Sequence, residues 1–226
     1  SIHSTIENIN LNTGSNVIYM RNGDQQITNN NGLIYQHLTI SGTSGNKTAS
    51  PGTLTIQGNF FKSGASNFLH NNGTVIFNNF IAGQAYTSTS SVPVSFYNLT
   101  NANIFTGLNV LNNMAIVNTL SLADNSKLNL TNGDITLLST ATNTARVAQI
   151  PSTATVTYGA VAGRFIVERY FPNNNPLSHR AWRLVTAPLN ETETIFNTWQ
   201  LGGAAYGAGN YHTGTLITGP QIAGNG

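Results

Sequence analysis

Cysteine is absent from the chain, and charged residues are scarce. Only 7% of the 226 residues are Asp, Glu, Lys or Arg, against roughly 25% in an ordinary soluble domain. Without cysteine the chain has neither an internal disulfide nor a thiol nucleophile, and its cellular compartment is left open. Hydrophobic residues make up 39% of the chain and the net charge is +2. A core can therefore form, and the composition is not that of a disordered chain.

Runs of basic residues and long apolar runs are also missing. The pI of about 9.0 reflects nine basic residues against seven acidic ones, and no stripe of Lys or Arg is present to follow a phosphate backbone. No apolar stretch reaches the roughly 18 residues that a membrane-spanning helix needs. We therefore expect neither nucleic acid as a partner nor a transmembrane segment. Ser1–Ser4 and Gly224–Gly226 suggest an internal piece of a longer, processed chain, whose flanking segments are expected partners.

Short β-rich runs recur at nearly constant intervals. Thr53–Ile56 is followed by a small polar turn and Phe60, and about 21 residues later Thr74–Phe77 is followed by a similar turn and Phe80. Asn-Gly and Asn-Asn steps lie between such runs, and these residues tolerate the left-handed backbone of tight corners. An interval of this length is typical of a solenoid, in which each repeat stacks on the one before it.

Two all-β architectures give short strands with polar corners, an antiparallel sandwich and a right-handed parallel β-helix (β-solenoid). A hairpin has no reason to repeat its side chains, whereas a coil lays each strand about 4.8 Å from its predecessor, so that like stacks on like. The repeats favour a β-helix over residues 1–160, and the sandwich is the alternative. The expected stacked pairs are Leu54 on Val75, Ile56 on Phe77 and Phe60 on Phe80. The expected core includes Leu54, Ile56, Val75, Phe77, Leu120, Leu122, Leu128 and Leu130.

Residues 164–226 are predicted to start a second domain, mostly β with one short helix. Two strand-like runs flank the loop "PNNNPLSH" and are expected to form an antiparallel hairpin. This register would pair Glu168 with Arg183 in a hydrogen-bonded ion pair and point Trp182 to the opposite face. Trp199 lies on the apolar face of the helix predicted in "NETETIFNTWQLGG". These four residues are assigned structural roles.

Four motifs within residues 163–220 carry a family resemblance. They are "GRFIVERYFP", "HRAWRLVTAPL", "TIFNTWQ" and "GTLITGP". Together they resemble a module of Asn/Thr-rich surface and secreted proteins of Bacteroidota, in which an R-x-W-R core follows a V-x-R-Y strand. Here that core is formed by Arg180, Trp182 and Arg183. The resemblance implies an adhesin-type substrate of the type IX secretion system, located extracellularly at the cell surface in association with the outer membrane.

The sequence predicts no catalytic, cofactor-binding or metal-binding residue, and no cofactor. The chain has no G-x-S-x-G elbow, and its five His residues lack the spacing of metal ligands. His37 and His70 could approach on adjacent coils, although polar wall positions are favoured. A carbohydrate-active β-helix enzyme would need clustered acids, and the solenoid half has only four acidic residues, well separated in the chain. Asp124 and Asp134 could lie one face apart.

Repeated T-x-T pairs raise the alternative of an ice-binding or glycan-binding module. The pairs are Thr53/Thr55, Thr87/Thr89 and Thr153/Thr155/Thr157. Ice binding needs a flat face of threonines on stacked coils, and these pairs do not recur at one expected coil position, so the sequence predicts a broken ladder.

The function expected from these observations is non-enzymatic. A solenoid needs only contacts between neighbouring coils, so it suits a long structural stalk, spacer or adhesive element. Self-association and surface glycans are the further partners that the sequence leaves open. The alternatives are a carbohydrate-active enzyme and an ice-binding or glycan-binding module.

Overall fold

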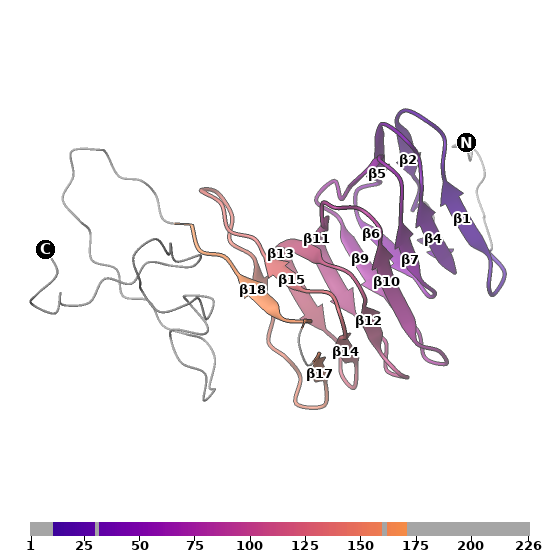
Figure 1. The fold of residues 1–226 in the computed structure, drawn as a ribbon. Helices are drawn as coiled ribbons and strands as arrows, with labels where there is room; N and C mark the ends of the chain where they lie inside the picture. Colours follow the sequence, from indigo (N-terminus) through magenta and orange to yellow (C-terminus); the bar gives the residue numbers. More distant parts are fainter. Residues whose placement is uncertain (1–10, 30–31, 160–161, 171–226) are drawn as a thin grey trace, which may run out of the picture. The chain divides into compact units, whose positions relative to one another are not determined.

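The computed structural model describes residues 11–29, 32–159 and 162–170, and these form a parallel β-helix of about six turns (Figure 1). Every strand pair within its sheets is parallel, and only an isolated bridge between Ser139 and Thr144 is antiparallel. The predicted β-solenoid is therefore confirmed, and the antiparallel sandwich is excluded for this part of the chain.

Three sheets form the walls of the coil. The first sheet contains β1 (Asn16–Tyr19), β4 (His37–Ile40), β7 (Phe60–Lys62), β10 (Gln84–Ser88), β12 (Leu108–Val110), β14 (Lys127–Leu130) and β17 (Thr155–Tyr158). The second sheet contains β2 (Gln25–Ile27), β5 (Asn46–Ala49) and β8 (Asn67–Leu69). The third sheet contains β3 (Ile34–Tyr35), β6 (Thr53–Ile56), β9 (Thr74–Phe77), β11 (Val94–Asn101), β13 (Met114–Leu122), β15 (Ile135–Leu137) and β18 (Phe165–Val167), with β16 (Arg146–Val147) beside β13.

The long strands β11 and β13 join two walls of the coil. The first half of β11, Val94–Phe96, pairs with β13, which continues to β15 and β18. The second half, Asn98–Asn101, lies between β9 and the second half of β13, which continues to β16. A register shift between Phe96 and Asn98 separates the halves, as a bulge does when it bends a strand. The two halves of β11 and of β13 therefore belong to different walls, and the coil keeps three walls although two of them share these strands.

The core consists of the inward side chains of all three sheets. Alternate strand residues point to opposite faces, so every second residue of a strand points into the core. All eight predicted core residues are buried in a single cluster. The register places Leu54 beside Val75 and Ile56 beside Phe77, so these two predicted stacked pairs are confirmed.

The predicted pair of Phe60 and Phe80 is wrong. Phe60 lies beside Tyr86 in the first sheet, with ring centroids 5.9 Å apart, whereas Phe80 is 58% exposed. The reason is local, because the Asn79 side-chain oxygen accepts the backbone N–H groups of Ile81 and Ala82. This turn lengthens the coil and directs Phe80 outward.

The corners that join the strands require special residues. Asn71, Asn72 and Asn125 have positive φ, as expected for Asn at a tight corner. Gly45 has a φ of 77°, and a Cβ there would lie 2.3 Å from the carbonyl carbon of Gly23 in the coil before it. Corners of successive coils are therefore in close backbone contact.

Two buried lysines bind the carbonyl groups of the corner between the first and second sheets, here called the lysine corner. The Lys47 ammonium donates to the carbonyl oxygens of Arg21, Gly23 and Ser44 at 2.8, 2.5 and 3.2 Å. The Lys62 ammonium donates to the Ser63 and Gly64 carbonyl oxygens at 2.9 and 2.8 Å. Burial lowers the pKa of Lys47, and burial with the neighbouring Lys47 charge lowers the pKa of Lys62.

Three neutral side chains perform the same task in the corner between the third and first sheets, here called the amide corner. They are Gln84, Asn101 and Asn103, at most 1% exposed. The Gln84 amide donates to the Ile56 and Gly58 carbonyls, both at 2.8 Å. The Asn103 amide donates to the Ala82 carbonyl at 2.9 Å, and its oxygen accepts the N–H groups of Phe105 and Gly107. Asn101 donates to the Lys127 carbonyl at 2.8 Å.

The stack of coils continues past residue 160. β17 pairs in parallel with β14, and β18 pairs in parallel with β15. Phe165–Val167, which the sequence analysis placed in the second domain, is therefore a strand of the solenoid. Arg183, Trp182 and Trp199, with the predicted hairpin partner and the predicted helix, lie outside the described residues.

Candidate functional site

The outer face of the third sheet carries two columns of small, mostly hydroxyl-bearing side chains, here called the hydroxyl ladder. Strands β6, β9, β11 and β13 each contribute one residue to each column. The first column is Thr53, Thr74, Asn98 and Thr119, and the second is Thr55, Ile76, Thr100 and Ser121. Seven of these eight side chains are polar, and none is charged.

The ladder points outward because its neighbours in each strand point inward. Leu54, Val75, Leu99 and Leu120 separate the two columns along the strands and are at most 3% exposed. These four inward residues are also direct register partners. The ladder is therefore backed by a continuous layer of close-packed apolar side chains.

The spacing of the ladder follows from sheet geometry. Neighbouring strands lie about 4.8 Å apart, and residues i and i+2 of a parallel strand lie about 6.6 Å apart. Each of the four strands contributes one rung, which is a pair of residues with one in each column. The four rungs therefore form a nearly rectangular array with these two spacings. The register shift in β11 lies just before Asn98, so it does not interrupt the array.

Most hydroxyl groups of the ladder make no hydrogen bond within the described residues. Asn98 donates to the Thr74 hydroxyl at 3.3 Å and accepts from the Asn118 amide at 2.8 Å. The hydroxyl groups of the other five Thr and Ser residues make no hydrogen bond to the rest of the described chain. They remain free to bind water or a ligand.

Different side chains lie beside the ladder at its two ends. Ile34 of β3 is the register partner of Thr55 and is 40% exposed. Arg146 of β16 is the partner of Thr119. The uncharged array is therefore bounded by an apolar residue on one side and a cation on the other.

The sequence analysis missed this alignment because the coils differ in length. The predicted break in the T-x-T ladder is confirmed, since of the three sets only Thr53/Thr55 lies on the third sheet. The alignment that was missed is the mixed one, in which successive members of the first column are 21, 24 and 21 residues apart. The extra residues lie in the turn between β9 and β10, so a fixed interval loses the match. The pairs Thr87/Thr89 and Thr155/Thr157 do lie elsewhere, on or beside β10 and β17 of the first sheet.

The two histidines that could approach on adjacent coils each have a separate backbone contact. His37 and His70 accept backbone N–H groups from Asn59 and Asn72 at 2.9 and 3.0 Å, and they belong to different walls. No three His, Cys, Asp or Glu side chains of the described residues are placed to hold a metal ion. Burial lowers the pKa of His70, whose ring lies 5.5 Å from that of Tyr97.

Three carboxylates accept hydrogen bonds from neighbouring loops and hold these loops in place. Asp134 accepts the N–H groups of Gly163 and Arg164 at 3.0 and 2.8 Å. Asp124 accepts the hydroxyl of Thr153 at 3.4 Å. Glu168 accepts the Ser139 N–H at 3.1 Å, while its predicted partner Arg183 lies outside the described residues. These three acids thus each have a separate hydrogen-bonding role.

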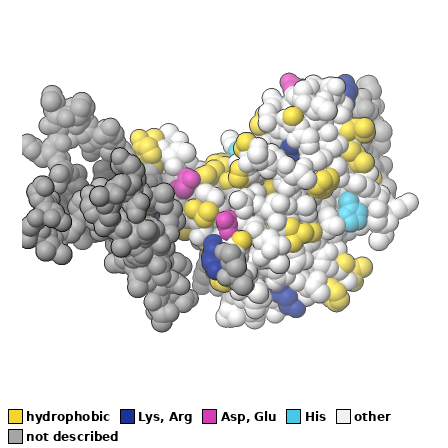
Figure 2. All heavy atoms as spheres, in the orientation of Figure 1, with side chains coloured by type: hydrophobic (Ala, Val, Ile, Leu, Met, Phe, Trp, Pro, Cys, Tyr) yellow, Lys and Arg dark blue, Asp and Glu magenta, His cyan; other side chains and the backbone are white. Residues whose placement is uncertain are grey.

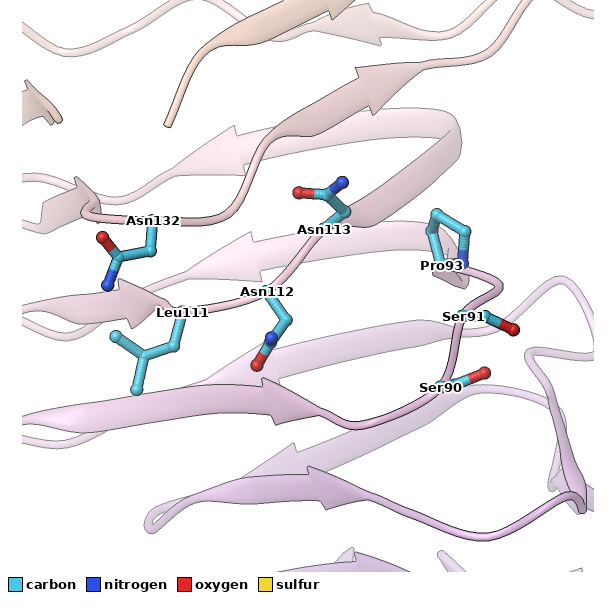
Figure 3. Close-up of a pocket in the computed structure, with 7 residues that line it drawn as sticks. All are labelled: Ser90, Ser91, Pro93, Leu111, Asn112, Asn113 and Asn132. Atoms are coloured by element: carbon cyan, nitrogen blue, oxygen red, sulfur yellow. The ribbon is translucent and has the colours of Figure 1, made fainter. Parts of the chain in front are cut away.

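A small surface pocket lies on the corner loops of three successive coils (Figure 3). Its volume is about 190 Å³, and its lining is Ser90, Ser91, Pro93, Leu111, Asn112, Asn113 and Asn132. Asn112 and Asn113 accept the backbone N–H groups of Ser88 and Asp134. The lining is neutral, and its amides already hold the loops together.

Four apolar side chains project from a pair of stacked turns, here called the apolar corner. Phe80, Ile81, Ile104 and Phe105 are 58%, 79%, 39% and 50% exposed. Asn79 and Asn103 hold the two turns through their side-chain oxygens. On the face drawn in Figure 2, charged side chains of the described residues are few and scattered.

Comparison of the chain with protein-family models, curated proteins and solved structures gives no match. The resemblance to Bacteroidota surface proteins thus remains a hypothesis based on the quoted motifs. In the part of the chain that the structure describes, no helix has the length and apolar character needed to cross a bilayer.

Proposed function

We propose that the chain is a non-enzymatic part of an extracellular surface protein, in which the solenoid serves as a structural stalk or adhesive spacer. The observation that carries this proposal is the in-register stacking of parallel strands through all described coils. Each coil is stabilised by its two neighbours, so length can be added without a new core. This property suits a spacer better than a globular binding domain.

The weak charge of the outer walls supports the same role. Long-range repulsion between neighbouring molecules is small when charges are few, so such stalks can stand close together. The apolar corner offers uncharged contact area for self-association. The motifs of residues 163–220 motivate the surface location and the export route, as a resemblance.

The enzyme alternative is tested by turnover. We expect no release of reducing ends or unsaturated products when the purified chain is incubated with a panel of neutral and acidic polysaccharides. Turnover that disappears in Asp124→Asn or Asp134→Asn would overturn the non-enzymatic proposal.

The spacer role is tested by attachment. We expect beads joined to a support through the chain to withstand repeated pulling and to stand off by the length of the folded solenoid. The matched control is the Ile56→Asp variant, whose coils should not stack. Equal extension curves for both chains would contradict a spacer built on stacked coils.

A further inference from the structure

We propose that the hydroxyl ladder is a binding surface for ordered water, and that through it the protein adsorbs to ice. This activity goes beyond the spacer role and does not depend on it. The columns Thr53, Thr74, Asn98, Thr119 and Thr55, Ile76, Thr100, Ser121 form the contact surface.

The first argument is geometric. A ligand that recognises a repeating array must itself repeat at the same intervals. The ladder repeats at about 4.8 Å across the strands and about 6.6 Å along them. Rows of oxygen atoms on a prism face of hexagonal ice repeat at an interval close to the shorter of these, and at a somewhat longer interval than the second in the perpendicular direction. A rigid water lattice can therefore follow the ladder from strand to strand.

The second argument concerns the chemistry of the rungs. Each Thr presents one methyl group and one hydroxyl group, which both donates and accepts hydrogen bonds. The methyl groups and the side chain of Ile76 restrict the orientations of the adjacent water molecules, and the hydroxyl groups hold these molecules in place by hydrogen bonds. Five of the ladder hydroxyl groups have no partner in the rest of the described chain, so they are free to bind water.

The third argument is the absence of charge on the rungs. A charged side chain orders water around itself in a shell that does not match a crystal lattice, and it is costly to desolvate. The four rungs carry no charge, and Arg146 lies beyond Thr119 at the edge of the array. The residues between the columns, Leu54, Val75, Leu99 and Leu120, are buried and add no charge to the surface.

A glycan fits the ladder less well. Sugar rings are commonly bound on an aromatic platform, and neither column contains an aromatic residue. Tyr97 lies in the strand just before Asn98, but its ring is near His70 rather than in the array. Binding of a glycan to this face is therefore treated as a result that would contradict the proposal.

The experiment measures the adsorption of the fluorescently labelled chain to a growing ice surface. We expect the unmodified chain to be enriched in the ice and to slow ice recrystallisation. Thr55→Tyr and Thr100→Tyr, each with a bulky ring in one column, should reduce the adsorbed fraction about tenfold, which corresponds to about 1.4 kcal/mol. The matched control is Thr87→Tyr, an outward residue of the first sheet, and it should leave adsorption unchanged.

Melting temperatures show which variants are folded. If a tyrosine variant does not fold, Thr55→Lys places a charge in the same column and should give the same loss. Exclusion of the unmodified chain from ice, or equal adsorption of ladder and control variants, would overturn the proposal. Binding to insoluble cellulose or chitin that is lost only in the ladder variants, without adsorption to ice, would assign the face to a glycan and would also overturn it.

Discussion

The lysine corner and the amide corner solve one problem with different chemistry. Both bind backbone carbonyl groups that the turning chain directs inward, and both are closed to solvent. The lysine corner uses two charged groups that are costly to bury, whereas the amide corner uses neutral groups that donate and accept at once. The comparison indicates that the solenoid needs hydrogen-bond donors at its corners, and that either a lysine ammonium group or a neutral amide can provide them.

The two corners also differ in how far they reach along the stack. Gln84 and Asn103 are hydrogen-bonded to each other at 3.1 Å. Through Gln84 to Ile56 and Asn101 to Lys127, the amides connect strands from β6 to β14. Lys47 and Lys62 bind carbonyls of the first three coils only. The amide corner should therefore couple more coils than the lysine corner.

The largest loss of stability is expected for a charge placed in the apolar core, away from the hydrogen-bonding groups of both corners. Ile56 is fully buried, and Ile56→Asp would place an unpaired charge in the core that both corners enclose. We expect a loss of more than about 4 kcal/mol in the free energy of unfolding, or no folding at all. The measurement is chemical denaturation, and the matched control is Thr55→Asp, one residue away on the outer face. An unchanged stability of Ile56→Asp would refute the assignment of the core.

Asn103→Leu should have the second largest effect. It leaves the Ala82 carbonyl and the N–H groups of Phe105 and Gly107 without their partner, and each unsatisfied buried group costs roughly 1–3 kcal/mol. We expect a loss of about 3 kcal/mol or more, measured by thermal and denaturant unfolding. Asn109→Leu, on the outer face of β12, is the comparison for a partly exposed amide, which loses one bond to the Gln84 carbonyl and one from Asn129. Equal losses in the two variants would show that the amide corner has no special weight.

Lys47→Met should cost less than Asn103→Leu. It removes the donor to three carbonyl groups, but it also removes a buried charge, and these effects oppose each other. We expect a loss of about 1–2 kcal/mol, again by denaturant unfolding, with the exposed Lys127→Met as control. A larger loss than in Asn103→Leu would reverse the ranking of the two corners.

The smallest effect is a pH dependence that belongs to the lysine corner alone. The pKa values of Lys47 and Lys62 are lowered by burial from the ordinary 10.5. Between the lowered values and 10.5 the unfolded chain holds more protons than the folded chain, so the free energy of unfolding rises with pH across this window. Below the window both states are protonated, and the destabilising cost of the buried charges is fully present.

The measurement is denaturant unfolding from pH 7 upward, compared with a variant that combines Lys47→Met and Lys62→Met. The variant should lack this part of the rise, and Lys127→Met should retain it. Parallel pH curves for the unmodified chain and the double variant would contradict a lowered lysine pKa.

The sequence allowed the β-helix and much of its core to be predicted, for a simple physical reason. Coils two and three repeat at 21 residues, so Leu54 and Val75 occupy matching positions in the sequence repeat and in the structure. The next coil is longer, which placed Phe60 beside Tyr86 and hid the alignment of Thr74 with Asn98. A fixed interval cannot anticipate where a coil will lengthen, because the extra residues are accommodated in turns.

The lysine corner was not predictable from sequence patterns. Lys47 and Lys62 occupy inward positions of strands, where a charged residue is normally excluded. Their partners are backbone carbonyls, which every residue has, so no residue type marks the site. The apolar corner was missed for a related reason, because Phe80 continued the expected alternation until the Asn79 turn redirected it.

The unequal length of the coils has a practical consequence for protein engineering. Residues added at the Phe80–Ala82 turn are accommodated outside the stack, where Asn79 anchors the loop and the strands on either side keep their register. Foreign peptides grafted at this turn should therefore be displayed without repacking the interior. Because the turn at Ile104–Phe105, held by Asn103, is stacked on this one, two grafts could be presented side by side.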